Sequence, residues 1–354
     1  MKKILLLPLL VFFITSCNIL VYKIKEFENV VFKAITIDTL FQDKISIRAI
    51  QIDKNKIWYA ADKGRFGYFN TDTNLKKEIE IAQDSLNLEF RSIAHTTANV
   101  FILNVGNPAL LYKIAKKDLQ LKLVYQESNE KVFFDSMQFW DENDGIAMGD
   151  PVSNCLNIIL TKDGGETWNK IPCEKLPEIE QGEAAFAASN TNITVKGNKA
   201  WIVSGGKRSR VFHSSNRGES WKVYETPIVQ GNAMTGIFTA DFYDKRNGFI
   251  AGGNYEAQSQ NFANKAISKN GGKTWKLIAE NKGFGYASCV QYVPESKGKG
   301  LVVVGTSGVH YSADAGTTWK QLSTDPKFYT VRFVNKNTAI AAGKDKVVRF
   351  NFKE

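Results

Sequence analysis

The chain has 354 residues and a formal net charge of +10 at neutral pH, with four cysteines and three histidines. This positive charge fits an anionic partner or a lipid headgroup surface, but solubility explains it equally well. The cysteines and histidines form no Cys-x-x-Cys pair and no Cys/His cluster, which argues against a zinc site and a thioredoxin-like centre. We therefore expect no metal and no cofactor. A chain of this length exceeds a typical single core, which directs attention to repeats.

The N-terminus has the features of an export signal. Lys2 and Lys3 precede an apolar stretch, residues 4–14, which is shorter than the roughly 20 residues of a membrane-spanning helix. The following Thr-Ser-Cys17 resembles a bacterial lipobox, which implies cleavage before Cys17 and attachment of lipid to its thiol; an ordinary secretory signal is the alternative. We expect a signal peptide at 1–16, a lipidated tether at 17–29 and a folded domain at 30–354, anchored to the inner or outer membrane of a bacterial envelope.

The segment Val30–Leu40 alternates well enough to be an isolated strand. Beyond it, an apolar strand, a polar turn and a second apolar strand that ends in small residues recur. Seven copies end near Ala61, Gly106, Gly149, Gly205, Gly252, Gly305 and Gly343. Units of about 40–50 residues, without helical periodicity, are typical of propeller blades. We expect an all-β, seven-bladed propeller of four-stranded blades at residues 45–82, 88–127, 132–173, 184–226, 235–280, 285–323 and 328–352.

The last of these copies has room for only three strands. We expect the N-terminal strand to become the outer strand of the last blade, because this closes the ring and hides a strand edge.

Four segments share the template [ST]-x-[DN]-x-G-x-[ST]-W, at residues 161–168, 214–221, 268–275 and 312–319. In a tight hairpin, the Asp or Asn side chain caps backbone N–H groups and the Gly adopts a positive φ. The Trp, on the next strand, fills the space between neighbouring sheets. These structural roles are assigned to Asp163, Trp168, Asn216, Trp221, Asn270, Trp275, Asp314 and Trp319.

The first of these turns also predicts a disulfide. If Thr161 pairs with Thr167 across the turn, constant register places Cys155 opposite Cys173. An exported protein folds in an oxidising compartment, so we expect these two cysteines to be bonded. A slip of one residue would instead place the thiols on opposite faces of the sheet.

The four turns resemble the Asp-box, or BNR repeat, of sialidases and related propellers. Together with the strands that end in glycine, they resemble the photosystem II assembly and stability factor family and the BNR-repeat lipoproteins of Bacteroidetes-type bacteria. The resemblance covers residues 45–352, although the first two blades lack a proper Asp-box. It implies the propeller fold, but one such fold carries many unrelated activities.

The loops opposite the Asp-box turns would line one mouth of the ring. Arg208 and Arg210 give this mouth a basic character, although loop charges are also easily solvated. Arg48, Arg91 and Arg332 lie on the inner strands of the first, second and last blades, which are neighbours in a closed ring. Three guanidiniums there could clamp a carboxylate or a phosphate. The alternative is that each pairs with a carboxylate of an inner strand or loop, such as Asp135, Glu183 or Asp241.

Catalytic chemistry has little support. Asp150, Glu183 and Asp241 are weak candidates for the carboxylate pair of a glycoside hydrolase, and loop capping or pairing with arginine is the alternative. The sequence contains no Tyr–Glu nucleophile pair that stands out, no Walker loop and no Gly-x-Ser-x-Gly elbow. An export signal and a moderate charge argue against nucleic-acid binding.

We therefore expect an envelope-anchored lipoprotein that acts as a binding or assembly scaffold rather than an enzyme. Its partner would be a protein or a glycan, held by the loop face of the propeller. The alternative is a glycoside hydrolase, sialidase-like or of another carbohydrate-active kind, that uses the same face.

Overall fold

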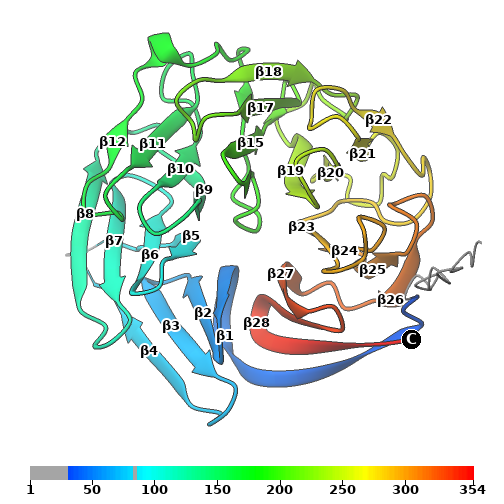
Figure 1. The fold of residues 1–354 in the computed structure, drawn as a ribbon, viewed down its shortest axis with the longest axis horizontal. Coiled ribbons are helices and arrows are strands. Elements are labelled where there is room, and N and C mark those ends of the chain that lie inside the picture. Colours follow the sequence, from blue (N-terminus) through cyan, green and yellow to red (C-terminus); the bar gives the residue numbers. More distant parts are fainter. Residues whose placement is uncertain (1–30, 83–85) are drawn as a thin grey trace, which may run out of the picture.

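The computed structural model describes residues 31–82 and 86–354, which form a ring of antiparallel sheets around a central axis (Figure 1). Apart from one short 3₁₀ helix, η1 (Cys173–Lys175), every regular element in these residues is a β-strand. No helix in this part of the chain is long and apolar enough to cross a membrane. The all-β propeller is therefore confirmed. The expected signal peptide and Cys17 lie outside the described residues.

Four of the sheets have four strands each, which follow one another from the axis to the rim (Figure 1). The first contains β5 (Phe90–His95), β6 (Asn99–Asn104), β7 (Ala109–Ala115) and β8 (Leu121–Glu127). The second contains β9 (Phe134–Phe139), β10 (Gly145–Gly149), β11 (Asn157–Thr161) and β12 (Asn169–Lys170). The third contains β14 (Ile193–Lys196), β15 (Lys199–Val203), β17 (Arg210–Ser214) and β18 (Lys222–Glu225). The fourth contains β23 (Cys289–Tyr292), β24 (Leu301–Gly305), β25 (Gly308–Ser312) and β26 (Lys320–Ser323).

Two further sheets have six strands each. One has the order β27 (Phe328–Asn335), β28 (Thr338–Lys353), β1 (Ala34–Asp53), β2 (Lys56–Ala61), β3 (Arg65–Asn70) and β4 (Lys76–Glu80). The other has the order β13 (Glu183–Ala184), β16 (Gly205–Gly206), β19 (Thr235–Phe242), β20 (Gly248–Asn254), β21 (Lys265–Ser268) and β22 (Lys276–Leu277).

The prediction of seven blades is wrong. Counted as hydrogen-bonded sheets, the described residues form six blades. The reason lies in β1 and β28, which have 20 and 16 residues and continue past the points at which the sequence pattern separates the first and last copies. Strands assigned to two blades therefore belong to one hydrogen-bonded sheet.

The first and last strands, β1 and β28, close the ring, as predicted. The first half of β1 pairs antiparallel with the second half of β28, from Ala34 opposite Lys353 to Gln42 opposite Lys346. The second half of β1 then pairs with β2. Because both halves of β1 have partners, the N-terminal strand presents no free edge at the seam.

The four [ST]-x-[DN]-x-G-x-[ST]-W segments form nearly identical turns, here called the motif turns. In the first, the Thr161 hydroxyl accepts a hydrogen bond from the Gly165 N–H (2.9 Å), and Asp163 Oδ1 accepts one from the Thr167 N–H (3.0 Å). Gly165 has a φ of +76°, which favours glycine. The same two bonds recur in the other three turns. The Asp and Asn side chains are therefore occupied in holding the turns.

The motif tryptophans pack where neighbouring sheets meet. The Trp168 ring contacts Phe101 on β6 edge-on and Phe139 on β9 in the same way, at centroid distances of 6.3 and 5.7 Å. In the other three turns, the indole N–H also donates to the carbonyl of the motif glycine at 2.9 Å. Apolar clusters of this kind between adjacent sheets make up the core.

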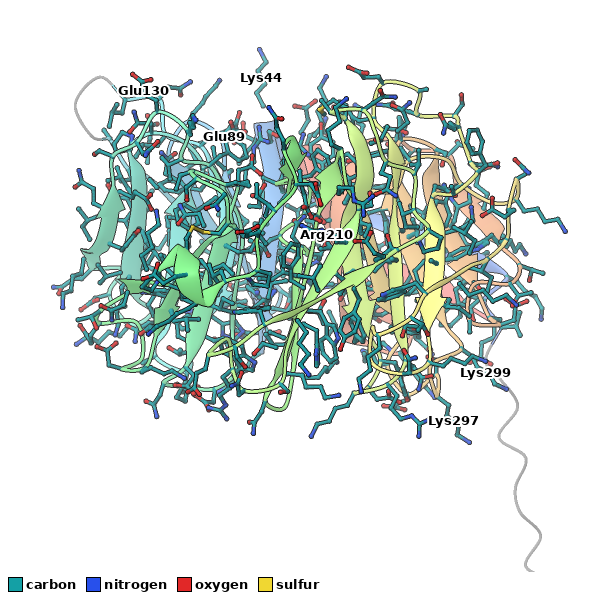
Figure 2. The ribbon with its side chains drawn as sticks, turned by 90° about the horizontal axis from the view of Figure 1, so that it is seen from above. Lys44, Glu89, Glu130, Arg210, Lys297 and Lys299 are labelled. Atoms are coloured by element: carbon teal, nitrogen blue, oxygen red, sulfur yellow. A yellow bond between two sulfur atoms is a disulfide. The ribbon has the colours of Figure 1, made fainter. Side chains whose placement is uncertain are left out.

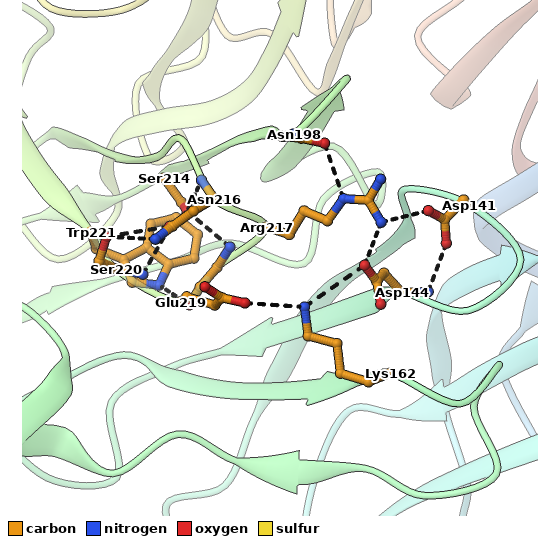
Figure 3. Close-up of polar contacts among 11 residues, drawn as sticks. Asp141, Asp144, Lys162, Asn198, Ser214, Asn216, Arg217, Glu219, Ser220 and Trp221 are labelled. Carbon is orange, nitrogen blue, oxygen red and sulfur yellow. Dashed lines mark hydrogen bonds and ion pairs between the residues drawn. The ribbon is translucent and has the colours of Figure 1, made fainter.

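The ring has two unlike faces, seen from the side in Figure 2. The loop face carries the β2–β3, β6–β7, β10–β11 and β24–β25 connections, and Lys44, Glu89 and Glu130 lie at this side in Figure 2. The turn face carries the motif turns and the β23–β24 turn, whose Lys297 and Lys299 lie at the opposite side. Blades are also linked across the turn face: Arg217 of the second motif turn bonds to Asp141 and Asp144 in the β9–β10 turn (Figure 3).

The predicted disulfide between Cys155 and Cys173 is present, with Cα atoms 5.6 Å apart. The register argument for it is wrong by one residue, because Leu160 pairs with Asn169. The strand β12 ends at Lys170, and Cys173 lies in η1, so the second cysteine is not held to the strand register. The bond forms because the chain leaves the sheet before Cys173.

Candidate functional site

A polar segment, Ser189–Asn192, closes the centre of the ring. It runs just ahead of β14, and all four of its residues are buried. Asn190 has a φ of +58°, which asparagine tolerates. Its side chain donates to the carbonyl of Ile93 on β5 (2.7 Å) and accepts from the Met137 N–H on β9 (2.9 Å).

The neighbours of Asn190 reach the other inner strands. Ser189 donates to the carbonyl of Ser288 at 2.7 Å, next to β23, and Thr191 bonds to Thr239 on β19 at 2.8 Å. Ser189–Asn192 thus forms a central plug that binds inner strands from around the ring. Each face of the propeller consequently has its own depression rather than a shared channel.

On the loop face, Arg48 lies against the plug. Its guanidinium donates to the carbonyl of Ala188 (3.2 Å) and stacks over the Tyr329 ring, 4.3 Å from the centroid. Its Nε–H is buried and has no hydrogen-bond partner among the described residues. Burial, followed by the positive charge of Arg91, lowers the pKa of Arg48. Arg48 is therefore a buried cation whose donors are only partly used.

Aromatic side chains surround Arg48. A cavity of about 50 Å³ is lined by Arg48, Tyr255, Tyr286, Ser288, Gly305, Thr306, Pro326, Phe328 and Tyr329. Gly305 ends β24 and Thr306 lies in the β24–β25 connection, so the cavity opens on the loop face. Tyr255 is 40% exposed at its edge, and the Tyr255 and Tyr286 rings meet edge-on at 5.2 Å. We call Arg48, Tyr255, Tyr286 and Tyr329 the mouth cluster.

The three inner-strand arginines do not share one cavity. Arg91 on β5 is close enough to affect the pKa of Arg48, but its guanidinium pairs with Glu89 at 2.8 Å. Arg332 lines a separate cavity of about 590 Å³ together with Lys196 and Tyr243, near the turn face. Its guanidinium donates to the carbonyls of Val331 (2.8 Å) and Ser189 (3.1 Å). Arg332 therefore holds the plug from the other side.

The two loop arginines also have partners. Arg210, seen between the two faces in Figure 2, forms a two-pronged ion pair with Glu183 at 3.0 and 2.5 Å, and both side chains are almost fully buried. Ser204 donates to the same carboxylate. Arg208 pairs with Glu225 at 3.0 Å on the rim. The sequence pattern predicted that both arginines line the mouth and bind a ligand; instead, each pairs with a carboxylate of the protein.

The three candidate catalytic carboxylates do not face one another across a cavity. Asp150 accepts the Ala185 N–H at 2.7 Å, and burial raises its pKa to about 6. Glu183 is occupied by Arg210, and Asp241 lines the cavity that contains Arg332. The Asp241 carboxylate accepts hydrogen bonds from the Tyr292 N–H (2.7 Å) and the Phe242 N–H (2.8 Å). Burial raises its pKa. All three therefore have structural partners.

Sequence reasoning missed the plug and the tyrosines of the mouth cluster. A run of four hydroxyl and amide side chains at 189–192, just where an apolar inner strand is expected, is the signal for the plug. It also treated Asp135 only as a possible partner for an arginine. Asp135 is fully buried with neither carboxylate oxygen hydrogen-bonded in the described residues, and burial, followed by Asp150, raises its pKa. No metal-binding group of three or more His, Cys, Asp or Glu residues occurs in residues 31–82 and 86–354.

Comparison with known proteins supports the fold. No family model and no curated protein matches the chain. Among solved structures, "YCF48 bound to D1 peptide" is similar with a TM-score of 0.66 at 13% identity, covering 92% of this chain and 97% of that one. YCF48 from Cyanidioschyzon merolae gives 0.63 at 12% identity, covering 90% and 98%. The WD40 repeats of RRP9 give 0.64 at 11% identity, covering 91% and 100%. The chain shares the β-propeller fold with these proteins.

Proposed function

We propose that this protein is an exported, lipid-anchored scaffold that binds a protein partner on the loop face, with the mouth cluster at the centre of the contact. The observation that carries this proposal is Arg48, whose buried Nε–H lacks a partner among the described residues and whose side chain lines a cavity with three tyrosines, of which Tyr255 is exposed. A carbonyl or carboxylate of a peptide that enters the cavity would accept from the half-buried guanidinium.

The shape of the mouth favours a peptide over a small substrate. The plug limits its depth, and the cavity beside Arg48 holds only about 50 Å³, too little to enclose a sugar ring or a cofactor. Tyrosines supply large contact areas at a low cost in side-chain entropy, as they do in many protein interfaces. The D1 peptide bound in the YCF48 complex is in line with this use of the fold.

Two further parts of the proposal come from the sequence. The hydrogen bonds of the motif turns are those expected of Asp-boxes, and we propose that the chain is a relative of BNR-repeat lipoproteins. The residues before Cys17 would direct export, and the lipid on Cys17 would hold the protein at the bacterial envelope.

The test is a capture experiment with the lipid-free protein and an extract of its own envelope, run beside a glycan array. Tyr255→Ala and Phe262→Ala alter exposed side chains in the β20–β21 loop, at 40% and 49% exposure. Val334→Ala, 47% exposed at the turn-face end of β27, is the matched control. We expect a discrete protein to be lost with the loop-face variants and kept with the control. Equal capture by all three variants, or saturable binding of a glycan alone, would overturn the proposal.

A further inference from the structure

Exposed basic side chains gather in one part of the turn face, across neighbouring blades. The group, here called the basic sector, consists of Lys245, Arg246, Lys269, Lys273, Lys299 and Lys336. They lie in the β19–β20, β21–β22, β23–β24 and β27–β28 turns. In the described part of the chain, none of these six side chains forms an ion pair with a carboxylate. Their charges are therefore available to an external anion.

Direct contacts join three of these turns, β19–β20, β21–β22 and β23–β24. The Gly271 N–H donates to the carbonyl of Arg246 (2.8 Å), and Lys199 Nζ donates to that of Lys245 (3.2 Å). The Lys297 N–H donates to the Tyr243 hydroxyl at 3.0 Å, which links the β23–β24 turn to the β19–β20 turn. Positive charges gathered on neighbouring turns raise the local potential for anions.

The four turns also carry two exposed acidic side chains, Asp244 and Glu295, against the six basic side chains of the basic sector, so a positive excess remains. Asp244 accepts hydrogen bonds from the Arg246 and Asn247 N–H groups and from the Asn247 side chain, so it serves to hold its own turn. The other side of the turn face is different. There, Arg217 and Lys162 pair with Asp144 (Figure 3). On that side, these two basic side chains are therefore paired with a carboxylate.

The described chain begins on the same face. Ala34 pairs with Lys353, and Phe32 packs on Tyr311 beside the last motif turn, whose Ala315 N–H donates to the carbonyl of Lys299 (2.8 Å). Cys17 precedes Val31 by 14 residues, which span at most about 50 Å. A lipid on Cys17 would therefore be joined to the propeller by a tether that enters it on this face.

We propose that the basic sector lies against a surface of anionic phospholipid headgroups and orients the propeller with its loop face away from the membrane. The inference deepens the proposed membrane anchorage, on which it rests. One lipid chain gives only marginal membrane attachment, and a basic patch is a common second contribution. In this arrangement the anchor and the basic sector act from one face, and the mouth cluster stays open to a partner.

The test uses unlipidated chain that starts at residue 17 with Cys17→Ser, since β1 and β28 close the ring within the described residues. Co-sedimentation compares phosphatidylglycerol vesicles with phosphatidylcholine vesicles at low and high salt. We expect binding to phosphatidylglycerol only, lost as salt screens the charges. The turn-face variant carries Lys245→Gln, Arg246→Gln, Lys299→Gln and Lys336→Gln, and we expect its affinity to fall by about fivefold per charge removed.

The matched control removes the same charge from the loop face, where Lys63, Lys131, Lys175 and Lys327 are exposed. Their replacement by Gln should leave vesicle binding within twofold. Equal losses in the two variants, or no preference of the parent protein for phosphatidylglycerol, would overturn the orientation. Partner capture by the loop face is a separate readout. If it fails while vesicle binding depends on the basic sector, the proposed scaffold role falls and the membrane orientation stands.

Discussion

Phe32 should be essential to the seam of the ring. It lies just ahead of β1 and is 1% exposed, with its ring centroid 4.8 Å from those of both Tyr311 and Phe352. The ring thus packs between β25 and the closing β1–β28 pair. Phe32→Ala would leave a cavity that the paired strands cannot collapse to fill. Truncating a buried Phe in this way lowers the free energy of unfolding by about 3–5 kcal/mol. That is a large part of the total for a typical protein, which is about 5–15 kcal/mol.

The free energy of unfolding can be measured by urea titration followed by the fluorescence of the seven tryptophans. Val31→Ala provides the control, because Val31 is the adjacent residue and is 49% exposed. We expect the control to change stability by no more than about 0.5 kcal/mol. If Phe32→Ala destabilises the protein no more than Val31→Ala does, the packing of Phe32 does not secure the closure of the ring.

Other predictions concern buried groups and the disulfide. Arg210→Met would leave the buried Glu183 carboxylate without its cation, and we expect a loss of about 3–5 kcal/mol in urea unfolding. Reducing the Cys155–Cys173 bond, at a sequence separation of 18, should cost about 3 kcal/mol, seen as a lower urea midpoint with reductant present. Burial raises the pKa of Asp150 to about 6. Protonated Asp150 therefore contributes fully to the free energy of unfolding below the ordinary pKa of an aspartate, and this contribution is lost as the pH rises through 6. Asp150→Asn should therefore gain stability relative to the parent protein between pH 4 and pH 7, and parallel pH profiles would contradict this assignment.

Features that depend on short sequence patterns were predictable. The motif turns follow from local chemistry, since the hydroxyl, carboxylate or amide and glycine that build each turn lie within a few residues. Closure by the N-terminal strand was predictable because the last repeat copy has room for only three strands and needs a fourth. The blade count was not predictable in the same way, because the boundary of a sheet depends on hydrogen bonds that continue along β1 and β28.

The site was harder to predict because its contacts join distant segments. Placement on an inner strand brings Arg48 and Arg332 toward the axis, but the plug at 189–192 then separates them. The backbone carbonyls of the plug accept hydrogen bonds from Arg332, and a search of the sequence for carboxylate partners cannot find such acceptors. Tyr286 lies in the β22–β23 connection and Tyr329 in β27, and they meet at Arg48 only in the closed ring.

Photo-crosslinking of the full-length, lipidated protein in intact cells tests the central claim most directly. A benzophenone amino acid would replace Phe262 on the loop face or Val334 on the turn face, both about half exposed. We expect Phe262 to give a discrete adduct with a protein and Val334 to give adducts with phospholipid. A protein adduct from Val334, with none from Phe262, would contradict a partner-binding loop face directed away from the membrane.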